Sequence, residues 1–266
     1  MPTKKQIQEF AEERDEFVND FSDEIEERLE KYEDYLYGLL MSFISEKDGP
    51  EDLIYDIRKV LVKDEMLPEI TQWWKTKTAE LIGLTAAYYN LYGVIRKETT
   101  EEPLFDFLDE HVKTVGSFKD EISRFTIGLA LSGMTIAEIS KSLSDKLKKA
   151  DKQGFVTRKL LSVFRDTAIE VSRATDLRYA REEGFKYAYY LGGLIETSRC
   201  FCKQRDQLIW SIDRINKWND LSWGGKIEGV DIKIALGGYN CRHYLMWIDD
   251  ETAEKYGYDR EYSECY

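Results

Sequence analysis

The chain has 266 residues, of which 42% are hydrophobic, 33% are charged and only 4 are proline. A chain of this length and composition folds into one large domain or two smaller ones, and its scarcity of proline favours long helices. The net charge of −13 argues against a broad interface with nucleic-acid phosphates, which needs clustered lysine and arginine, so direct DNA binding is not expected. A local basic strip from Lys141 to Lys152 stays open as a smaller site.

The N-terminal segment is acidic and has the periodicity of a helix. It lacks the apolar stretch of a signal peptide, and no apolar run in the sequence reaches the roughly 18 residues that span a bilayer, so we expect cytoplasmic synthesis and no membrane partner. Residues 1–35 carry thirteen acidic and five basic side chains. Over residues 5–45, apolar residues recur at alternating steps of four and three, which predicts a long amphipathic helix that packs in its own domain or binds a partner. The predicted seam is Ile25, Leu29, Tyr32, Leu36, Leu39 and Phe43.

Five further helices are expected before residue 184. Their approximate ranges are 51–64, 68–97, 103–131, 135–149 and 156–183. Local signals support the ends: proline at residues 50 and 103, a capping box formed by Thr135 and Glu138, and Gly184 as a C-terminal cap. We interpret the aromatic stripe of the 68–97 helix as core; it consists of Trp73, Trp74, Leu81, Leu84, Tyr88, Tyr89 and Tyr92.

The last of these helices is rich in charge. It carries Arg165, Arg173, Arg178 and Arg181 beside Glu170, Asp176 and Glu182. Opposite charges spaced along one helix are typical of a solvated face with salt bridges, and we predict such a face here.

After Gly184 the pattern changes from helical to aromatic and glycine-rich. Strands are predicted at 185–191 and 194–197, and four of the six tryptophans follow. The expected fold is therefore α+β and mostly α. We expect a helical body over residues 1–184, a small α+β module over 185–250 and an acidic, tyrosine-rich surface tail over 251–266.

Three of the four cysteines and one of the two histidines form two short couples, Cys200 with Cys202 and Cys241 with His243. The first interpretation makes Cys202 and Cys241 buried neighbours, as thiols or, in an oxidising environment, as a disulfide. The second is a structural zinc site built from the four residues, although paired zinc ligands usually have about two to four residues between them. The third is a catalytic pair with Cys202 or Cys241 as nucleophile and His243 as base, although Cys-x-His in an extended segment points its side chains in parallel.

Sequence motifs of common enzymes are missing. The chain has no Walker-type phosphate loop, no His-Glu-x-x-His and no Gly-x-Ser-x-Gly. Glycine pairs at 192–193, 224–225 and 237–238 lack the strand–helix context of a dinucleotide site. We therefore expect neither an enzyme nor a cofactor, with structural zinc as the alternative.

Segments between residues 185 and 248 carry a resemblance to a known family. An aromatic strand is followed by Thr197 to Asp206, of the type Thr-Ser-Arg-x-Phe-Cys with later basic and acidic residues. A tryptophan-containing stretch over 208–218 precedes Gly-Gly-x-Asn-Cys-Arg-His at 237–243, and a strand is expected at 244–248. In this order the segments resemble the phage Mu F-like minor head proteins, the head morphogenesis proteins of tailed phages. The family often lacks a cysteine at the position of Cys200 and commonly has glycine where this chain has Gln207.

The resemblance implies a few-copy component of the virion head, in the capsid interior or at the portal vertex, with host cytoplasm as the place of assembly. It implies a role in head morphogenesis and, in some phages, in DNA delivery. The portal protein is the implied partner, with the major capsid or scaffold protein as further candidates. The matching motif residues, which we interpret as a structural clasp, are Arg199, Cys202, Asn240, Cys241, Arg242 and His243.

Two other functions stay open at this stage. One is a toxin-like enzyme module, a nuclease or transferase that uses His243, Arg199 and Glu196. The other is a zinc-stabilised interaction module with no link to virions.

Overall fold

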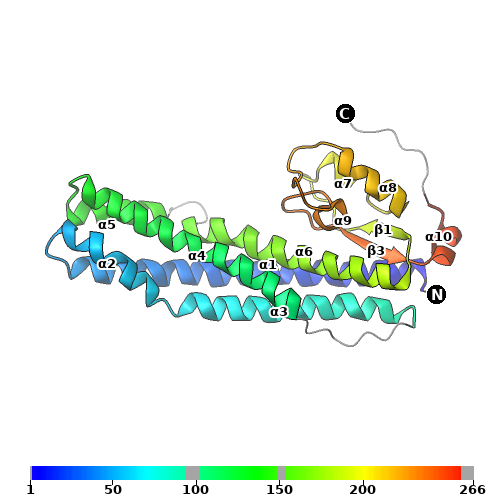
Figure 1. Ribbon diagram of the computed structural model, residues 1–266, viewed down its shortest axis with the longest axis horizontal. Coiled ribbons are helices and arrows are strands. Elements are labelled where there is room, and N and C mark those ends of the chain that lie inside the picture. Colours follow the sequence, from blue (N-terminus) through cyan, green and yellow to red (C-terminus); the bar gives the residue numbers. More distant parts are fainter. Residues whose placement is uncertain (1, 94–101, 149–153, 259–266) are drawn as a thin grey trace. The chain divides into compact units, whose positions relative to one another are not determined.

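The protein is mostly α-helical with one small antiparallel sheet, as the sequence predicts (Figure 1). The computed structural model describes residues 2–93, 102–148 and 154–258, without the side chains of 102–116. The long helices are α1 (Lys4–Ser45), α2 (Pro50–Val62), α3 (Met66–Asn90), α4 (Glu102–Leu131), α5 (Ile136–Leu147) and α6 (Phe155–Glu183). The later elements are β1 (Tyr187–Leu191), α7 (Cys200–Lys203), β2 (Leu208–Ser211), α8 (Ile212–Lys217), η1 (Trp218–Asp220), α9 (Ile232–Ala235), β3 (Tyr244–Ile248) and α10 (Asp250–Tyr256). Among the described residues, none of the helices has an apolar stretch long enough to cross a membrane.

The chain forms two compact units, neither of which is continuous in sequence. The first comprises Met1–Phe21, Lys77–Glu101 and Arg165–Tyr266, and the second comprises Ser22–Thr76 and Glu102–Phe164. Helices α1, α3 and α6 each contribute residues to both units. The first unit thus combines the module expected over 185–250 with parts of α1, α3 and α6, which were expected to belong to the helical body over 1–184.

Local sequence chemistry determines the helix ends, and the predicted signals are confirmed. Helix α2 begins at Pro50, where the missing amide hydrogen of proline costs nothing. The Thr135 side chain accepts a hydrogen bond from the Glu138 amide at 3.3 Å, and the Glu138 carboxylate accepts one from the Thr135 amide at 2.8 Å. Gly184 follows α6 with a φ of 72°, the left-handed conformation of a C-terminal cap.

The buried stripe of α1 differs from the predicted seam in its last two turns. Residues 25, 29, 32 and 36 are fully buried, but the stripe then continues at Leu40 and Ile44, while Leu39 and Phe43 are half-buried. A helix with 3.6 residues per turn drifts by about 20° per heptad against a strict seven-residue pattern. The burial therefore follows steps of eleven residues, such as Val18, Leu29 and Leu40, and no heptad seam persists along the helix.

An acidic residue of α1 completes the N-terminus of α6 within the second unit. The Glu33 carboxylate is buried and accepts hydrogen bonds from the Val156 amide at 2.9 Å and the Thr157 hydroxyl at 3.1 Å. A carboxylate at this position satisfies amides that have no partner inside the helix and interacts favourably with the helix dipole. Elsewhere in the unit, the Trp74 indole donates to the Phe164 carbonyl at 2.9 Å, which supports the interpretation of Trp74 as core.

The sheet has the strand order β2-β1-β3, and both pairings are antiparallel. Strand β1 is central and pairs Tyr189 with Ile209 on one side and with Met246 on the other. The predicted strands at 185–191 and 244–248 are confirmed with small changes of bounds. The strand predicted at 194–197 is wrong: this segment is an exposed loop and turn. Residues 208–211 occupy the place beside β1, so the apolar Leu194 and Ile195 stay outside the sheet.

The two faces of the sheet pack against different parts of the first unit. Because side chains alternate along a strand, residues 245 and 247 of β3 face a tryptophan-rich core and residues 244 and 246 face α1. The core contains Ala188, Tyr190, Trp210, Ile215, Trp218, Leu236, Leu245 and Trp247. On the α1 side, Arg14 lies 4.0 Å from the centre of the Tyr244 ring. All five residues of β3 are consequently buried.

The C-terminal residues begin with a short helix. Helix α10 starts at Asp250, and its Thr252 and Ala253 are fully buried. The surface tail predicted from residue 251 is therefore wrong for these first residues, because Ala253 packs inside the unit. Residues 259–266 of the predicted tail lie outside the described part of the chain.

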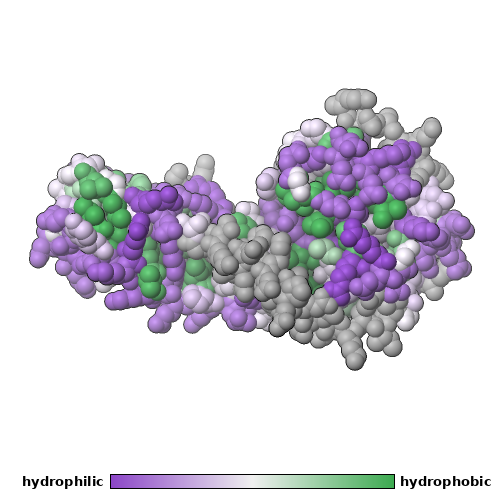
Figure 2. Space-filling view, in the orientation of Figure 1, coloured by the Kyte–Doolittle hydropathy of each residue, from purple (hydrophilic) through white to green (hydrophobic). Residues whose placement is uncertain are grey.

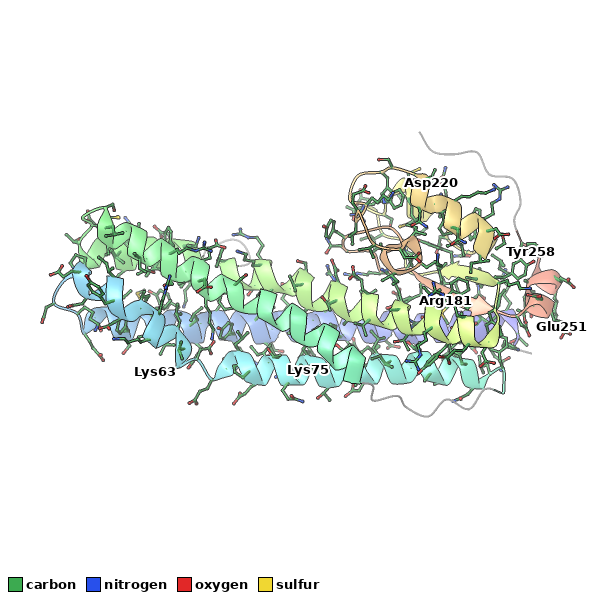
Figure 3. The ribbon with its side chains drawn as sticks, in the orientation of Figure 1. Lys63, Lys75, Arg181, Asp220, Glu251 and Tyr258 are labelled. Carbon is green, nitrogen blue, oxygen red and sulfur yellow. The ribbon has the colours of Figure 1, made fainter. Side chains whose placement is uncertain are left out.

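The charged face predicted for α6 is only partly solvated. Arg181 is exposed, as expected (Figure 3), and hydrophilic residues cover most of the visible face of the molecule (Figure 2). Asp176 and Arg173 are instead buried, with 1% and 4% of their surface exposed. Both residues have fixed partners elsewhere in the first unit, which the spacing of charges along α6 does not reveal.

The partner of Asp176 is the fully buried Arg14 of α1. The Nη1 atom of Arg14 lies 2.7 Å from a carboxylate oxygen of Asp176. The Nη2 atom of Arg14 donates a hydrogen bond to the Ser172 hydroxyl at 2.6 Å. Burial raises the pKa of Asp176 to about 6, and Arg14 counteracts part of that rise. The pair joins α1 to α6 inside the unit.

We predict that Asp176→Asn lowers the free energy of unfolding by about 3–5 kcal/mol, because it leaves the Arg14 charge buried without its partner. The double variant Arg14→Met with Asp176→Leu recovers most of that loss, since no buried charge remains. Urea unfolding at pH 8, where the Asp176 carboxyl is ionised, measures both. The exposed Glu182→Gln on the same helix is the control, and a cost for Asp176→Asn no larger than that of the control contradicts the prediction.

Candidate functional site

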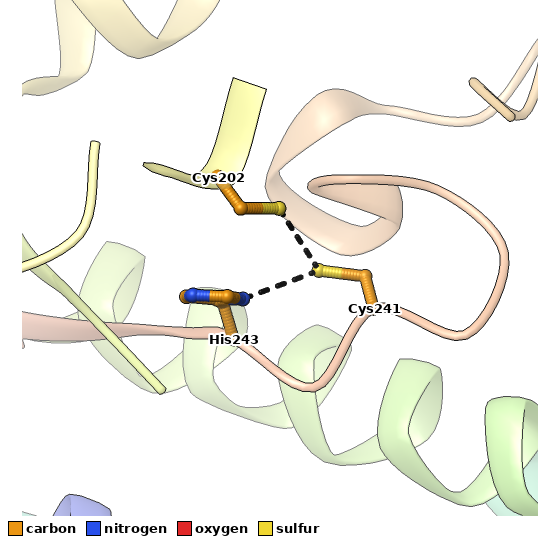
Figure 4. A group of neighbouring side chains, drawn as sticks. All are labelled: Cys202, Cys241 and His243. Carbon is orange, nitrogen blue, oxygen red and sulfur yellow. Dashed lines mark hydrogen bonds between the residues drawn. The ribbon is translucent and has the colours of Figure 1, made fainter. Parts of the chain in front are cut away.

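Cys202, Cys241 and His243 meet in a buried cluster of the first unit (Figure 4). The two sulfur atoms are 4.0 Å apart, and the Cys241 sulfur lies 3.8 Å from His243 Nδ1. All three donor atoms lie within 4.8 Å of one another. Residues 39 positions apart in sequence thus present their soft donors to a common point, as the interpretation of Cys202 and Cys241 as buried neighbours requires.

Cys200 lies outside this cluster because its segment is helical. A zinc site that uses both Cys200 and Cys202 needs this segment to be extended, so that both side chains lie on one face. The segment instead forms the single-turn helix α7, in which residues two apart point in different directions. Cys202 and Phe201 are buried while Cys200 is exposed, so the four-residue ligand set is reduced to three.

Cys241 and His243 face each other rather than pointing in parallel. They precede β3, which begins at Tyr244, so the alternation of an extended strand does not govern their directions. The preceding Asn240 has a φ of 61°, a left-handed conformation that asparagine tolerates. This turn brings the Cys241 thiol back toward the imidazole.

The glycine pair before this turn is required by close packing on both of its sides. A β-carbon on Gly237 would lie 2.5 Å from the Cys202 sulfur and 2.9 Å from the Cys241 sulfur. A β-carbon on Gly238, which has a φ of 88°, would lie 1.8 Å from the Gly225 carbonyl oxygen. The Gly237 amide also donates to the Cys241 sulfur at 3.3 Å. Gly237 therefore makes room for the sulfur pair, and Gly238 makes room for the Gly225 carbonyl.

Arg173 of α6 holds the cluster loop by its backbone. Its buried guanidinium donates to four carbonyls, at 3.0 Å to His243, 2.6 Å to Cys241, 2.9 Å to Ile234 and 3.4 Å to Ala235. Burying a guanidinium is costly unless its donors are satisfied. The four carbonyls accept hydrogen bonds from the guanidinium and so satisfy its donors. The same bonds fix the backbone at the end of α9 and on both sides of Arg242.

The polar residues of the motif attach the same loop to neighbouring helices. Asn240 donates its amide to Asp166 of α6 at 3.1 Å, and its side chain accepts a hydrogen bond from Arg165. Arg242 donates to Asn19 of α1 at 2.5 Å. These contacts attach Asn240 to α6 and Arg242 to α1.

Arg199 extends these attachments to the other half of the motif. It donates to the Gly224 carbonyl at 2.9 Å, and the Gly225 carbonyl in turn accepts a hydrogen bond from the Tyr239 amide at 3.1 Å. The loop at 224–225 therefore links Arg199 to the glycine turn at 237–239.

The second nitrogen of His243 faces a carboxylate. His243 Nε2 lies 3.6 Å from an Asp206 oxygen, and neither atom has a hydrogen-bond partner although both are buried. The separation is slightly longer than a hydrogen bond. Burial raises the pKa of Asp206, and the nearby His243 counteracts part of that rise.

The two thiols are electrostatically different. A hydrogen bond from Cys202 lowers the pKa of Cys241 against the effect of burial, and the charge of Arg173 lowers it further. The same hydrogen bond, together with burial, raises the pKa of Cys202. Cys241 is therefore the thiol of the pair that ionises more readily, and thiolates are both nucleophiles and ligands for soft metals.

The cluster opens on a cavity of about 280 Å³. Arg199 and Arg242 line it together with the two clustered cysteines and His243. Glu196, the third residue expected for a toxin-like enzyme, is exposed in the turn beside it and is not among the lining residues. The arrangement offers a nucleophilic thiolate next to an imidazole, or three donors for a thiophilic metal, at the wall of a small cavity.

Two residues of the site were missed from sequence. Asp206 lies in the motif at 197–206, two residues before β2, and an acidic residue that follows basic ones there is a signal for a functional position. Arg173 gave no usable signal, because an arginine on a charged helix looks the same whether it is solvated or buried against carbonyls.

Comparison with known protein families, with characterised proteins and with solved structures finds no significant match to this chain.

We predict that Gly237→Ala lowers the free energy of unfolding by about 1–3 kcal/mol, because the added methyl group overlaps both cluster sulfurs in a packed interior. Urea unfolding followed by far-ultraviolet circular dichroism measures the loss. Gly224→Ala is the matched control, since a β-carbon there meets nothing within 4 Å. Equal stability of the two variants would show that the sulfur pair leaves more room than its geometry indicates.

Proposed function

We propose that this protein is a minor head protein of a tailed phage, which associates with the portal and acts in head morphogenesis and in DNA delivery. The observation that carries the proposal is that the two halves of the motif, at 197–206 and 237–243, meet in space. Cys202 contacts Cys241, and Asp206 faces His243. Residues that were matched only by their order along the chain therefore form one physical unit.

A departure from the family pattern also supports the proposal. The family commonly has glycine where this chain has Gln207. Gln207 has a φ of 60°, in the left-handed region that glycine adopts without steric cost. The turn after Asp206 thus has the backbone conformation that the family's residue favours, even though the side chain differs.

The acidic helix α1 provides a surface for a basic partner. Among the acidic residues of the first 35 positions, only Asp15, Glu26 and Glu33 are not exposed. Complementary charge speeds association and selects partners. We assign the exposed carboxylates of α1 to docking on the portal, with the major capsid or scaffold protein as further candidates.

The proposal predicts that the protein is packaged in virions in a few copies. Mass spectrometry of gradient-purified virions is the measurement, with the portal protein in the same sample as the internal reference. Detection at a stoichiometry at or below that of the portal is the expected result. If the portal protein is detected in the virions and this protein is not, the proposal is wrong.

A further inference from the structure

We propose that Cys202, Cys241 and His243 bind a zinc ion, with the fourth coordination position open to the neighbouring cavity. The inference is independent of the proposed role in phage heads, since it rests only on the geometry of the three donors. It assigns a metal site to a buried group of two free thiols and an imidazole.

The donor atoms already have nearly the spacing of tetrahedral zinc ligands. With zinc–sulfur bonds of about 2.3 Å and zinc–nitrogen bonds of about 2.0–2.1 Å, the tetrahedral edges are roughly 3.8 Å between two sulfurs and roughly 3.6 Å between sulfur and nitrogen. The corresponding distances here are 4.0 Å and 3.8 Å. These two edges therefore need to shorten by only about 0.2 Å to match these values. The third edge, between the Cys202 sulfur and the imidazole, is within 4.8 Å, and metal binding would draw these two residues closer together.

Asp206 occupies the place of an outer carboxylate. A histidine that binds zinc through one ring nitrogen almost always donates the hydrogen of the other nitrogen to a carboxylate or carbonyl, which fixes the tautomer. His243 Nδ1 points to the sulfurs, and its Nε2 faces Asp206 at 3.6 Å with both atoms buried and without hydrogen-bond partners. A small shift of the Asp206 side chain toward the ring would close this contact to a hydrogen bond.

The surroundings of Cys241 favour a negatively charged sulfur. The Gly237 amide donates to the Cys241 sulfur, and the Arg173 guanidinium lies against the carbonyl of the same residue. Such donors and positive charge stabilise negative sulfur. A disulfide is the competing state, but it requires the sulfurs at about 2.05 Å and would leave the imidazole with no partner on its Nδ1 side.

The ligand count determines the type of site. Closed structural zinc sites have four protein ligands, whereas sites with three keep an open position for water or another ligand. The three donors line the cavity of about 280 Å³ together with Arg199 and Arg242. The open position therefore faces a space with two cations, which suits water, hydroxide or a small anion as the fourth ligand.

The test uses the full chain, purified under reducing conditions without chelator. Elemental analysis is expected to find a zinc ion for each chain. Replacement by Co²⁺ is expected to give thiolate-to-cobalt charge-transfer bands in the near ultraviolet together with the intense visible bands of four-coordinate cobalt. Cys202→Ser, Cys241→Ser and His243→Asn lose the metal, whereas the exposed Cys200→Ser retains it.

The variant Asp206→Asn keeps all three zinc ligands. It therefore tests the site through a change of zinc affinity and not through the loss of a ligand. We expect it to weaken zinc affinity about 10–100-fold in a competition titration with a chromophoric chelator. The matched control is Asp220→Asn, since Asp220 is exposed (Figure 3). A wild-type protein without zinc, whether its thiols are free or joined in a disulfide, overturns the proposal. Equal zinc binding by the cysteine variants and the wild type overturns it as well.

Discussion

The C-terminal module depends on one buried guanidinium. Arg173 satisfies four backbone carbonyls between residues 234 and 243, two in α9 and two in the loop that joins α9 to β3. This loop has no regular secondary structure, so its buried carbonyls need partners from outside a helix or a sheet. Arg173 supplies those partners from a rigid helix, so the loop is held in the one conformation that turns Cys241 toward His243.

The cluster follows from this constraint together with tight packing. Once the loop is fixed, Gly237 leaves space for two sulfurs, and α7 brings Cys202 into it from the other half of the motif. The Arg14–Asp176 pair secures α1 to α6 beneath β3 in the same unit. Breaking either arginine's contacts leaves a buried charge uncompensated, and both arginines therefore make the arrangement specific as well as stable.

Sequence determines the features of this fold that depend on neighbouring residues. Pro50, the Thr135–Glu138 box and Gly184 fix helix ends through local chemistry. The scarcity and spacing of cysteine and histidine predict a group of four, of which Cys202, Cys241 and His243 meet and Cys200 does not. Burial of Arg173 and Asp176 could not be predicted, because their partners lie far away in the chain. The exclusion of Cys200 depended on α7 being helical rather than extended, which four residues do not encode by themselves. The last two positions of the α1 seam were missed because a heptad and an eleven-residue repeat diverge only over several turns.

Hydrogen exchange of Arg173→Lys tests the central claim that Arg173 holds the cluster loop. Lysine keeps the charge but lacks the planar fork that reaches several carbonyls at once. Mass spectrometry is expected to show faster exchange in peptides covering 232–248, with α1 peptides unchanged. Arg178→Lys, on an exposed position of the same helix, is expected to behave as wild type. Unchanged protection at 232–248 in Arg173→Lys, or a loss spread evenly over the whole unit, would contradict the account.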